Sequence, residues 1–277
     1  MTDNVAGDYL QRVGEIVAAI HDHETDHIRR AAGLAATAIA AGGYTHLFGT
    51  GHSHAATMDV YPRIGGYDGF NPIVEPSLTK FQGVVGNEGL RQISFFEGVP
   101  GLAEAFLVNQ MVAVPDAMVL VSNSGINTVV VEMAIGCRER GIPVIAVTSR
   151  KHSDSTQSRH PSGSKLLDLA DVVIDTHVPV GDSIMEVEGL RYPVGAVSSI
   201  ASVSIIQSLV SQTAAELVAL GAAPNQIPSH NRHDAAESGA EASTELSLVS
   251  WARRRAARLE SLSRPDGPWG AEKSRTR

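Results

Sequence analysis

The most constraining feature of this sequence is a unit that occurs twice, in which a strand-like run of five residues leads into a turn rich in glycine or hydroxyl side chains. The first run covers 44–48 and is followed by Gly49-Thr50-Gly51-His52-Ser53. The second covers 117–121 and is followed by Ser122-Asn123-Ser124-Gly125 and a helical pattern over 128–140. Short β-prone runs bounded by turns are typical of buried strands in a parallel sheet. We therefore predict two strand–turn–helix units.

The rest of the chain continues this alternation. Apolar residues at three- and four-residue spacing predict a long amphipathic helix over 8–41, which Gly42-Gly43 end. Further strands are predicted at 143–147 and 171–175. Strands that alternate with helices pair in parallel through right-handed crossovers. The sequence therefore predicts an α/β fold with a doubly wound parallel sheet.

Length and composition favour a single core. The chain has 277 residues, of which 43% are hydrophobic, and this is enough for one substantial domain. We place that domain at 1–235, including the long first helix. Residues 236–277 have few large apolar side chains outside 246–251, so we expect a short C-terminal helix and a flexible tail from about Ser263.

Charge and cysteine content exclude several classes of protein. Lys and Arg number 22 against 30 Asp and Glu, which gives a net charge of −8 and makes nucleic acid an unsuitable partner. We expect no membrane span, because the weakly polar run 194–220 contains serine, glutamine and glutamate, and no signal peptide, because Asp3 and Asp8 occupy the start. The expected location is the cytoplasm. The single Cys137 is predicted to be a buried, unreactive side chain.

The two turns have the chemistry of a phosphate site. Ligands of α/β sheets bind at the carboxyl ends of strands, where glycines permit close approach and helix N-termini donate N–H groups. Either turn alone is also typical of ordinary helix capping, but the two together favour a phosphomonoester ligand. The dinucleotide fingerprint is disfavoured because His54 stands where a third glycine is expected, and no Walker-type sequence is present.

Five segments carry a resemblance to a known family. They are 48–54, 61–66, 71–76, 121–127 and 158–163. In these segments the chain resembles the SIS (sugar isomerase) domain proteins, and within them the UPF0309 group, from the first helix to about Arg232. The resemblance implies a three-layer αβα sandwich of flavodoxin-like topology, a homodimer or homotetramer, and phosphosugar binding through Ser53, Ser122 and Ser124. One departure is Asn127, where many SIS isomerases have threonine.

The predicted ligand-binding residues come from both turns and one nearby arginine. They are Gly49, Thr50, Gly51, His52, Ser53, His54, Arg63, Ser122, Asn123, Ser124, Gly125, Asn127 and Thr128. His54 could instead face the preceding strand, and Arg63 could instead hold its loop through an internal carboxylate.

Aldose–ketose isomerisation needs a base that moves a proton between adjacent carbons and a group that opens the sugar ring. Glu75 is the first candidate base, because it follows an apolar strand-like segment, and Glu88 is a second. Glu97 is expected at the surface. His230 is the candidate for ring opening, and a dimer interface is one way to deliver it. We expect no metal, because the histidines lie in separate polar segments. We expect no organic cofactor, because proton transfer needs none and the SIS isomerases, which the chain resembles, work without one.

Three functions remain open on sequence grounds. The first is a phosphosugar isomerase. The second is a lyase resembling N-acetylmuramic acid 6-phosphate etherase, which is disfavoured because the segment after Ser53 lacks an arginine found in that group. The third is a non-catalytic phosphosugar sensor, although the single helix before Tyr44 leaves no room for a DNA-binding helix-turn-helix.

Overall fold

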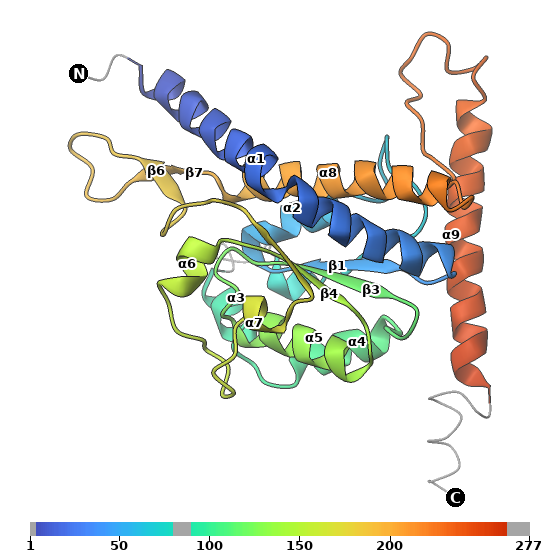
Figure 1. The fold of residues 1–277 in the computed structure, drawn as a ribbon, viewed down its shortest axis with the longest axis horizontal. Helices are drawn as coiled ribbons and strands as arrows, with labels where there is room; N and C mark the ends of the chain where they lie inside the picture. The colour runs from blue at the N-terminus through green and yellow to red at the C-terminus, as the bar shows by residue number, and fades with distance from the viewer. Residues whose placement is uncertain (1–3, 80–89, 265–277) are drawn as a thin grey trace, which may run out of the picture.

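A parallel sheet of five strands forms the centre of the molecule (Figure 1). The computed structural model describes residues 4–79 and 90–264. The strand order is β2-β1-β3-β4-β5, and every neighbouring pair is parallel. The strands are β1 (Thr45–Gly49), β2 (Phe70–Pro72), β3 (Ala117–Val121), β4 (Val144–Thr148) and β5 (Val172–Asp175). This confirms the predicted doubly wound α/β fold.

Helices cover both faces of the sheet and complete the three layers. One face packs against α1 (Val5–Ala40), α2 (His54–Met58) and α8 (Ser198–Ala219). The other packs against α4 (Leu102–Asn109), α5 (Thr128–Glu139) and α7 (Leu166–Leu169). The short helices are η1 (Gly51–Ser53), η2 (Pro76–Leu78), α3 (Leu90–Phe96) and α6 (Arg150–Asp154). The αβα sandwich and the long first helix are both confirmed.

The strands separate two hydrophobic cores because successive side chains point to opposite faces. In β3, Val119 and Val121 belong to the core beneath α1 and α8. Met118 and Leu120 belong to the core beneath α4 and α5. Cys137 lies in this second core, fully buried, and burial raises the pKa of its thiol to about 12. The prediction of a buried cysteine is confirmed.

The C-terminal helix α9 (Ala240–Ser263) is longer than the short helix predicted. It stands across the ends of α1 and α8 (Figure 1). The ring of Trp251 stacks on Tyr61 at 6.4 Å between centroids, and Arg254 donates to the carbonyl oxygens of Ile39 and Gly43. These contacts explain the length, because they anchor turns of α9 that have no strong apolar stripe. The predicted tail falls mostly outside the described residues.

A second, antiparallel sheet of two short strands, β6 (Ser183–Met185) and β7 (Val194–Ala196), lies beside the amino-terminal half of α1. Figure 1 shows this hairpin and the start of α1 projecting together beyond the sheet. In the part of the chain that the structure describes, every helix is too short or too polar to cross a lipid bilayer.

Polar residues at the amino edge of the large sheet form a buried network around Asp116. Its carboxylate accepts hydrogen bonds from the backbone N–H of Tyr44 at 2.8 Å and of Ala113 at 3.0 Å, from His46 Nε2 at 3.1 Å, and from Arg258. Burial alone would raise the pKa of Asp116. The hydrogen bond and charge of His46, with the two N–H groups, outweigh burial and lower this pKa below its ordinary value.

Candidate functional site

The two predicted turns lie side by side at the carboxyl edge of the sheet. We call residues 49–53 loop 1 and residues 122–127 loop 2. Loop 1 begins at the end of β1 and loop 2 follows β3, and these strands are neighbours in which Gly49 pairs with Val121. A Cβ at Gly49 would lie 3.0 Å from the Val121 carbonyl oxygen, so glycine allows this close approach without a shift of the neighbouring backbone. The fold thus brings the two loops together.

Loop 2 is held by a hydrogen bond within itself. The Gly125 N–H donates to Ser122 Oγ at 3.1 Å, and Gly125 has φ of +64°, which favours glycine. Gly125 is one of the predicted ligand-binding residues, whereas in the structure its N–H donates inside the loop. Ser122 is correspondingly buried and shapes the turn.

Two hydroxyl groups at the loops are available to a ligand. Among the residues that the structure describes, the side chains of Ser53 in loop 1 and Ser124 in loop 2 have no hydrogen-bond partner. Both are half-buried. Thr128, by contrast, donates its hydroxyl to the Arg159 carbonyl oxygen at 3.3 Å, and Asn127 accepts at its amide oxygen from the Arg159 guanidinium at 2.9 Å. Loop 2 therefore has supporting contacts on one side and unpaired donors at Ser124 and the Asn127 amide group.

Glu97 links loop 1 to the helix that follows loop 2, and the expectation of a surface position for it is wrong. It follows α3, its carboxylate accepts a hydrogen bond from Thr50 Oγ1, and its backbone oxygen accepts from the Val129 N–H at 3.1 Å. The side chain is half-buried. Nothing in the local sequence reveals this, because the Glu97 position depends on how the segment after α3 passes between β1 and α5.

The other predicted acids and bases fall in different places. Glu75 follows β2 at the same carboxyl edge, half-buried, and accepts from Ser77 N–H and Oγ at 3.3 and 2.9 Å. Glu88 lies outside the described residues. His230 is exposed on the segment between α8 and α9, where its Nε2 contacts Thr244 Oγ1 at 2.9 Å. That segment lies at the opposite, amino edge of the sheet (Figure 1), so one protomer does not bring His230 to the loops.

The remaining predicted residues brace the loops or stand apart from them. His54 is buried, its Nδ1 contacts the Gly49 carbonyl oxygen at 3.2 Å, and burial lowers its pKa. It faces the strand rather than a ligand. His52 is exposed. Arg63 is paired with Asp59, which confirms the alternative of an internal carboxylate, and Asn123 Nδ2 lies 3.2 Å from His152 Nδ1.

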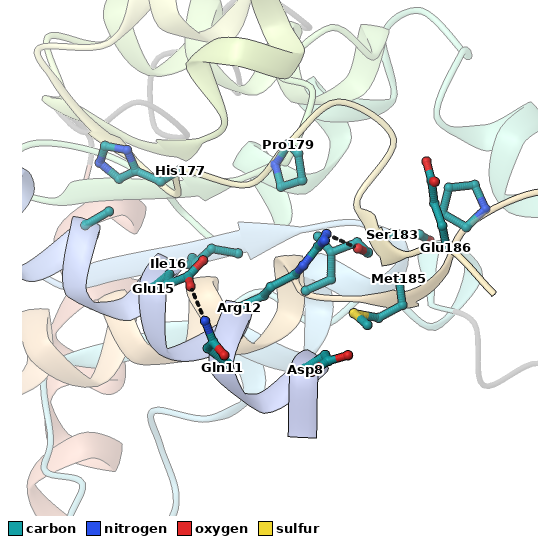
Figure 2. A pocket seen from close by; sticks show the side chains of 13 residues that line it. Asp8, Gln11, Arg12, Glu15, Ile16, His177, Pro179, Ser183, Met185 and Glu186 are labelled. Carbon is teal, nitrogen blue, oxygen red and sulfur yellow. Dashed lines mark hydrogen bonds between the residues drawn. The ribbon is translucent and has the colours of Figure 1, made fainter. Parts of the chain in front are cut away.

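A cavity of about 1010 Å³ lies away from the loops, between α1 and the segment 177–193. Figure 2 shows the side chains from α1 and from the β6–β7 region that line it. Its charged groups include Arg12 against Asp8, Glu15 and Glu186. This excess of carboxylates suits a phosphate poorly, so the loops remain the better phosphate site.

The family follows from comparison of the sequence with known proteins. The profile of the SIS domain matches residues 8–149, a range that includes both loops. The chain belongs to the SIS-domain family. A UPF0309 protein from Halalkalibacterium halodurans is 35% identical over 224 residues, which cover 81% of this chain and 90% of that protein. A UPF0309 protein from Streptomyces griseus is 33% identical over 232 residues, covering 83% and 91%. The SIS and UPF0309 resemblance is confirmed.

A solved structure supports the SIS fold independently. The phosphoheptose isomerase from Neisseria gonorrhoeae superposes with a TM-score of 0.52 over 77% of this SIS protein and 98% of that chain, at 14% sequence identity. At that identity the likeness concerns the fold.

Proposed function

We propose that this SIS protein binds a phosphorylated sugar between loops 1 and 2 and interconverts its aldose and ketose forms. The observation that carries the proposal is the position of Glu97, a carboxylate hydrogen-bonded to loop 1 and joined through its backbone to the helix that follows loop 2. Membership of the SIS family and the name of the fold neighbour, a phosphoheptose isomerase, support the same reading.

The phosphate would bind to neutral donors. The Ser53 and Ser124 hydroxyls and the Asn127 amide group supply side-chain donors. The first turn of α5 supplies backbone N–H groups other than that of Val129, which already donates to the Glu97 carbonyl oxygen. This arrangement places the anion at the positive end of a 12-residue helix. The sugar would then extend from loop 2 toward loop 1.

Glu97 is the proposed general base, in preference to Glu75. Thr50 donates to one Glu97 oxygen and leaves the other free to take a proton from a sugar carbon and return it to the neighbouring carbon. The Glu75 carboxylate accepts both donors of Ser77 at its Oε1 atom and caps η2, which is a local structural role, whereas Glu97 is bonded to loop 1 itself.

Ring opening is proposed to use His230 from a second copy of the chain, since His230 lies at the other edge of its own sheet. The start of α1 and the β6–β7 connection carry exposed large apolar side chains, among them Leu10 and Tyr192, each 68% exposed. Such side chains are typical of subunit contacts. We therefore propose a homodimer or homotetramer.

The test is a thermal-shift screen against hexose, pentose, heptose and amino-sugar phosphates, with NMR in D₂O on each ligand that stabilises the protein. An isomerase converts the ligand and exchanges deuterium at the carbon beside the carbonyl. Release of lactate from a muramic acid phosphate would identify the lyase instead. A stabilising ligand that stays unchanged would identify a sensor, and no response to any phosphosugar would contradict the proposal.

A further inference from the structure

Arg159 makes three hydrogen bonds with the end of loop 2 and the first residue of α5. Its N–H donates to the Ile126 carbonyl oxygen at 2.9 Å, its carbonyl oxygen accepts from Thr128 Oγ1 at 3.3 Å, and its Nη1 donates to Asn127 Oδ1 at 2.9 Å. The segment is closed on itself by Ser158 Oγ, which donates to the Ser164 carbonyl oxygen at 2.6 Å. Arg159 therefore approaches the start of α5 in one fixed position.

The chemistry of the guanidinium decides which way the Asn127 amide points. A guanidinium donates hydrogen bonds and never accepts them, so the atom of Asn127 that it contacts is the amide oxygen. Asn127 is the N-cap of α5, yet its side chain makes no capping bond, and its amide oxygen accepts from Arg159. Its NH₂ group has no partner among the described residues and is left as a donor at loop 2.

Arg159 also brings a positive charge to loop 2. In the described ranges 4–79 and 90–264, Arg159 forms no salt bridge, and its side chain is exposed. The two hydroxyls at the loops are neutral, and this guanidinium contacts loop 2 directly. The charge strengthens the hydrogen bond to the Asn127 amide oxygen and, through it, the NH₂ group as a donor to an anion at loop 2.

We propose that Arg159 is a positioning residue of the ligand site, which holds the Asn127 amide as a donor to the phosphate and thereby selects a phosphomonoester over an uncharged sugar. The inference rests on the proposed function. It makes a specific prediction, because Arg159 would matter through Asn127. A threonine at position 127 donates from a rotating hydroxyl, needs no such orientation, and would depend on Arg159 much less.

The experiment is a double-mutant cycle on the full chain, with inorganic phosphate at pH 8 as the ligand and calorimetry as the readout. Arg159→Gln is expected to weaken phosphate binding about tenfold when Asn127 is present, as loss of a charge-assisted contact does. In an Asn127→Thr background the same change is expected to cost no more than about twofold, which is a coupling well outside additivity. Arg159→Lys, which keeps a charged donor, should recover most of the affinity.

Controls separate this role from a structural one. Arg138 is an exposed arginine at the other end of α5 that donates once, to the Leu169 carbonyl oxygen at 3.0 Å, so Arg138→Gln should leave phosphate binding unchanged. The melting temperature of each unliganded variant shows whether it folds. If Arg159→Gln weakened phosphate binding equally with Asn127 present and in the Asn127→Thr background, this inference would be overturned and the proposed function would stand. No phosphate binding by the unaltered protein, with no phosphosugar response, would overturn the proposed function as well.

Discussion

At the amino edge of the sheet the carboxylate of Asp116 accepts from Tyr44, Ala113, His46 and Arg258, whereas at the carboxyl edge the hydroxyl of Ser124 has no partner among the described residues. Strands β1 and β3 both begin at the amino edge and end at the carboxyl edge, so each strand connects the two environments. A buried polar group without a partner costs free energy, so paired groups at the amino edge stabilise the fold. The unpaired, half-buried groups at the other edge are the donors that we propose for a ligand. The two edges should therefore respond differently to substitution.

The largest effect is expected at Glu97. Glu97→Gln keeps the acceptor for Thr50 but removes the base, so turnover of the substrate found by the screen should fall about 10²- to 10⁴-fold. The melting temperature should hardly change. Glu75→Gln is the matched control, because that carboxylate only caps η2. If Glu97→Gln kept the turnover of the unaltered protein and Glu75→Gln lost it, Glu75 rather than Glu97 would be the base.

Asp116→Ala tests the opposite edge. The substitution leaves Arg258, His46 and two backbone N–H groups without their buried acceptor, so the free energy of unfolding should fall by about 3–5 kcal/mol. Phosphosugar affinity of the folded fraction should stay the same. Asp154→Ala, an exposed carboxylate at the end of α6, is the control and should cost less than about 0.5 kcal/mol. A stable Asp116→Ala protein that fails to bind ligand would contradict the expectation that the amino edge serves stability and the carboxyl edge serves binding.

Acid should lower the free energy of unfolding through protonation of Asp116. The folded pKa of Asp116 is depressed, so its contribution is present above the unfolded pKa of about 3.9 and is lost as pH falls through the lower folded value. Urea unfolding from pH 7 to pH 3 should therefore show stability falling more steeply in the unaltered protein than in Asp116→Asn. Parallel curves for the two proteins would show that Asp116 is not a source of the acid sensitivity.

Local patterns were sufficient for the fold and for the loops. The apolar run 117–121 predicts β3, the three-four spacing predicts α1, and the glycines of both turns predict where the ligand site begins. These features depend on residues close together in sequence. The resemblance to the SIS family added the layer arrangement, which the structure confirms.

Long-range contacts explain what local patterns missed. Glu97 is an ordinary polar residue between Phe96 and Gly98 in the sequence, and only its contacts with Thr50 and Val129 make it part of the site. The length of α9 likewise depends on side chains that reach α1, and its own apolar pattern is weak. Interactions of this kind join residues dozens of positions apart, so no local pattern encodes them.

The smallest effects are expected within loop 2, which contains one serine with a structural hydrogen bond and one serine without a partner. Ser124→Ala removes an unpaired hydroxyl, so it should weaken phosphosugar binding by about 1 kcal/mol, near fivefold, and leave the unfolding free energy unchanged. Ser122→Ala removes the acceptor of the Gly125 N–H, so it should lower stability by about 1 kcal/mol and weaken binding only through the altered turn. Urea unfolding and calorimetry on both variants measure the two quantities separately. If Ser124→Ala instead lowered stability and left affinity intact, the unpaired hydroxyl would be structural, and the phosphate would have to bind elsewhere than loop 2.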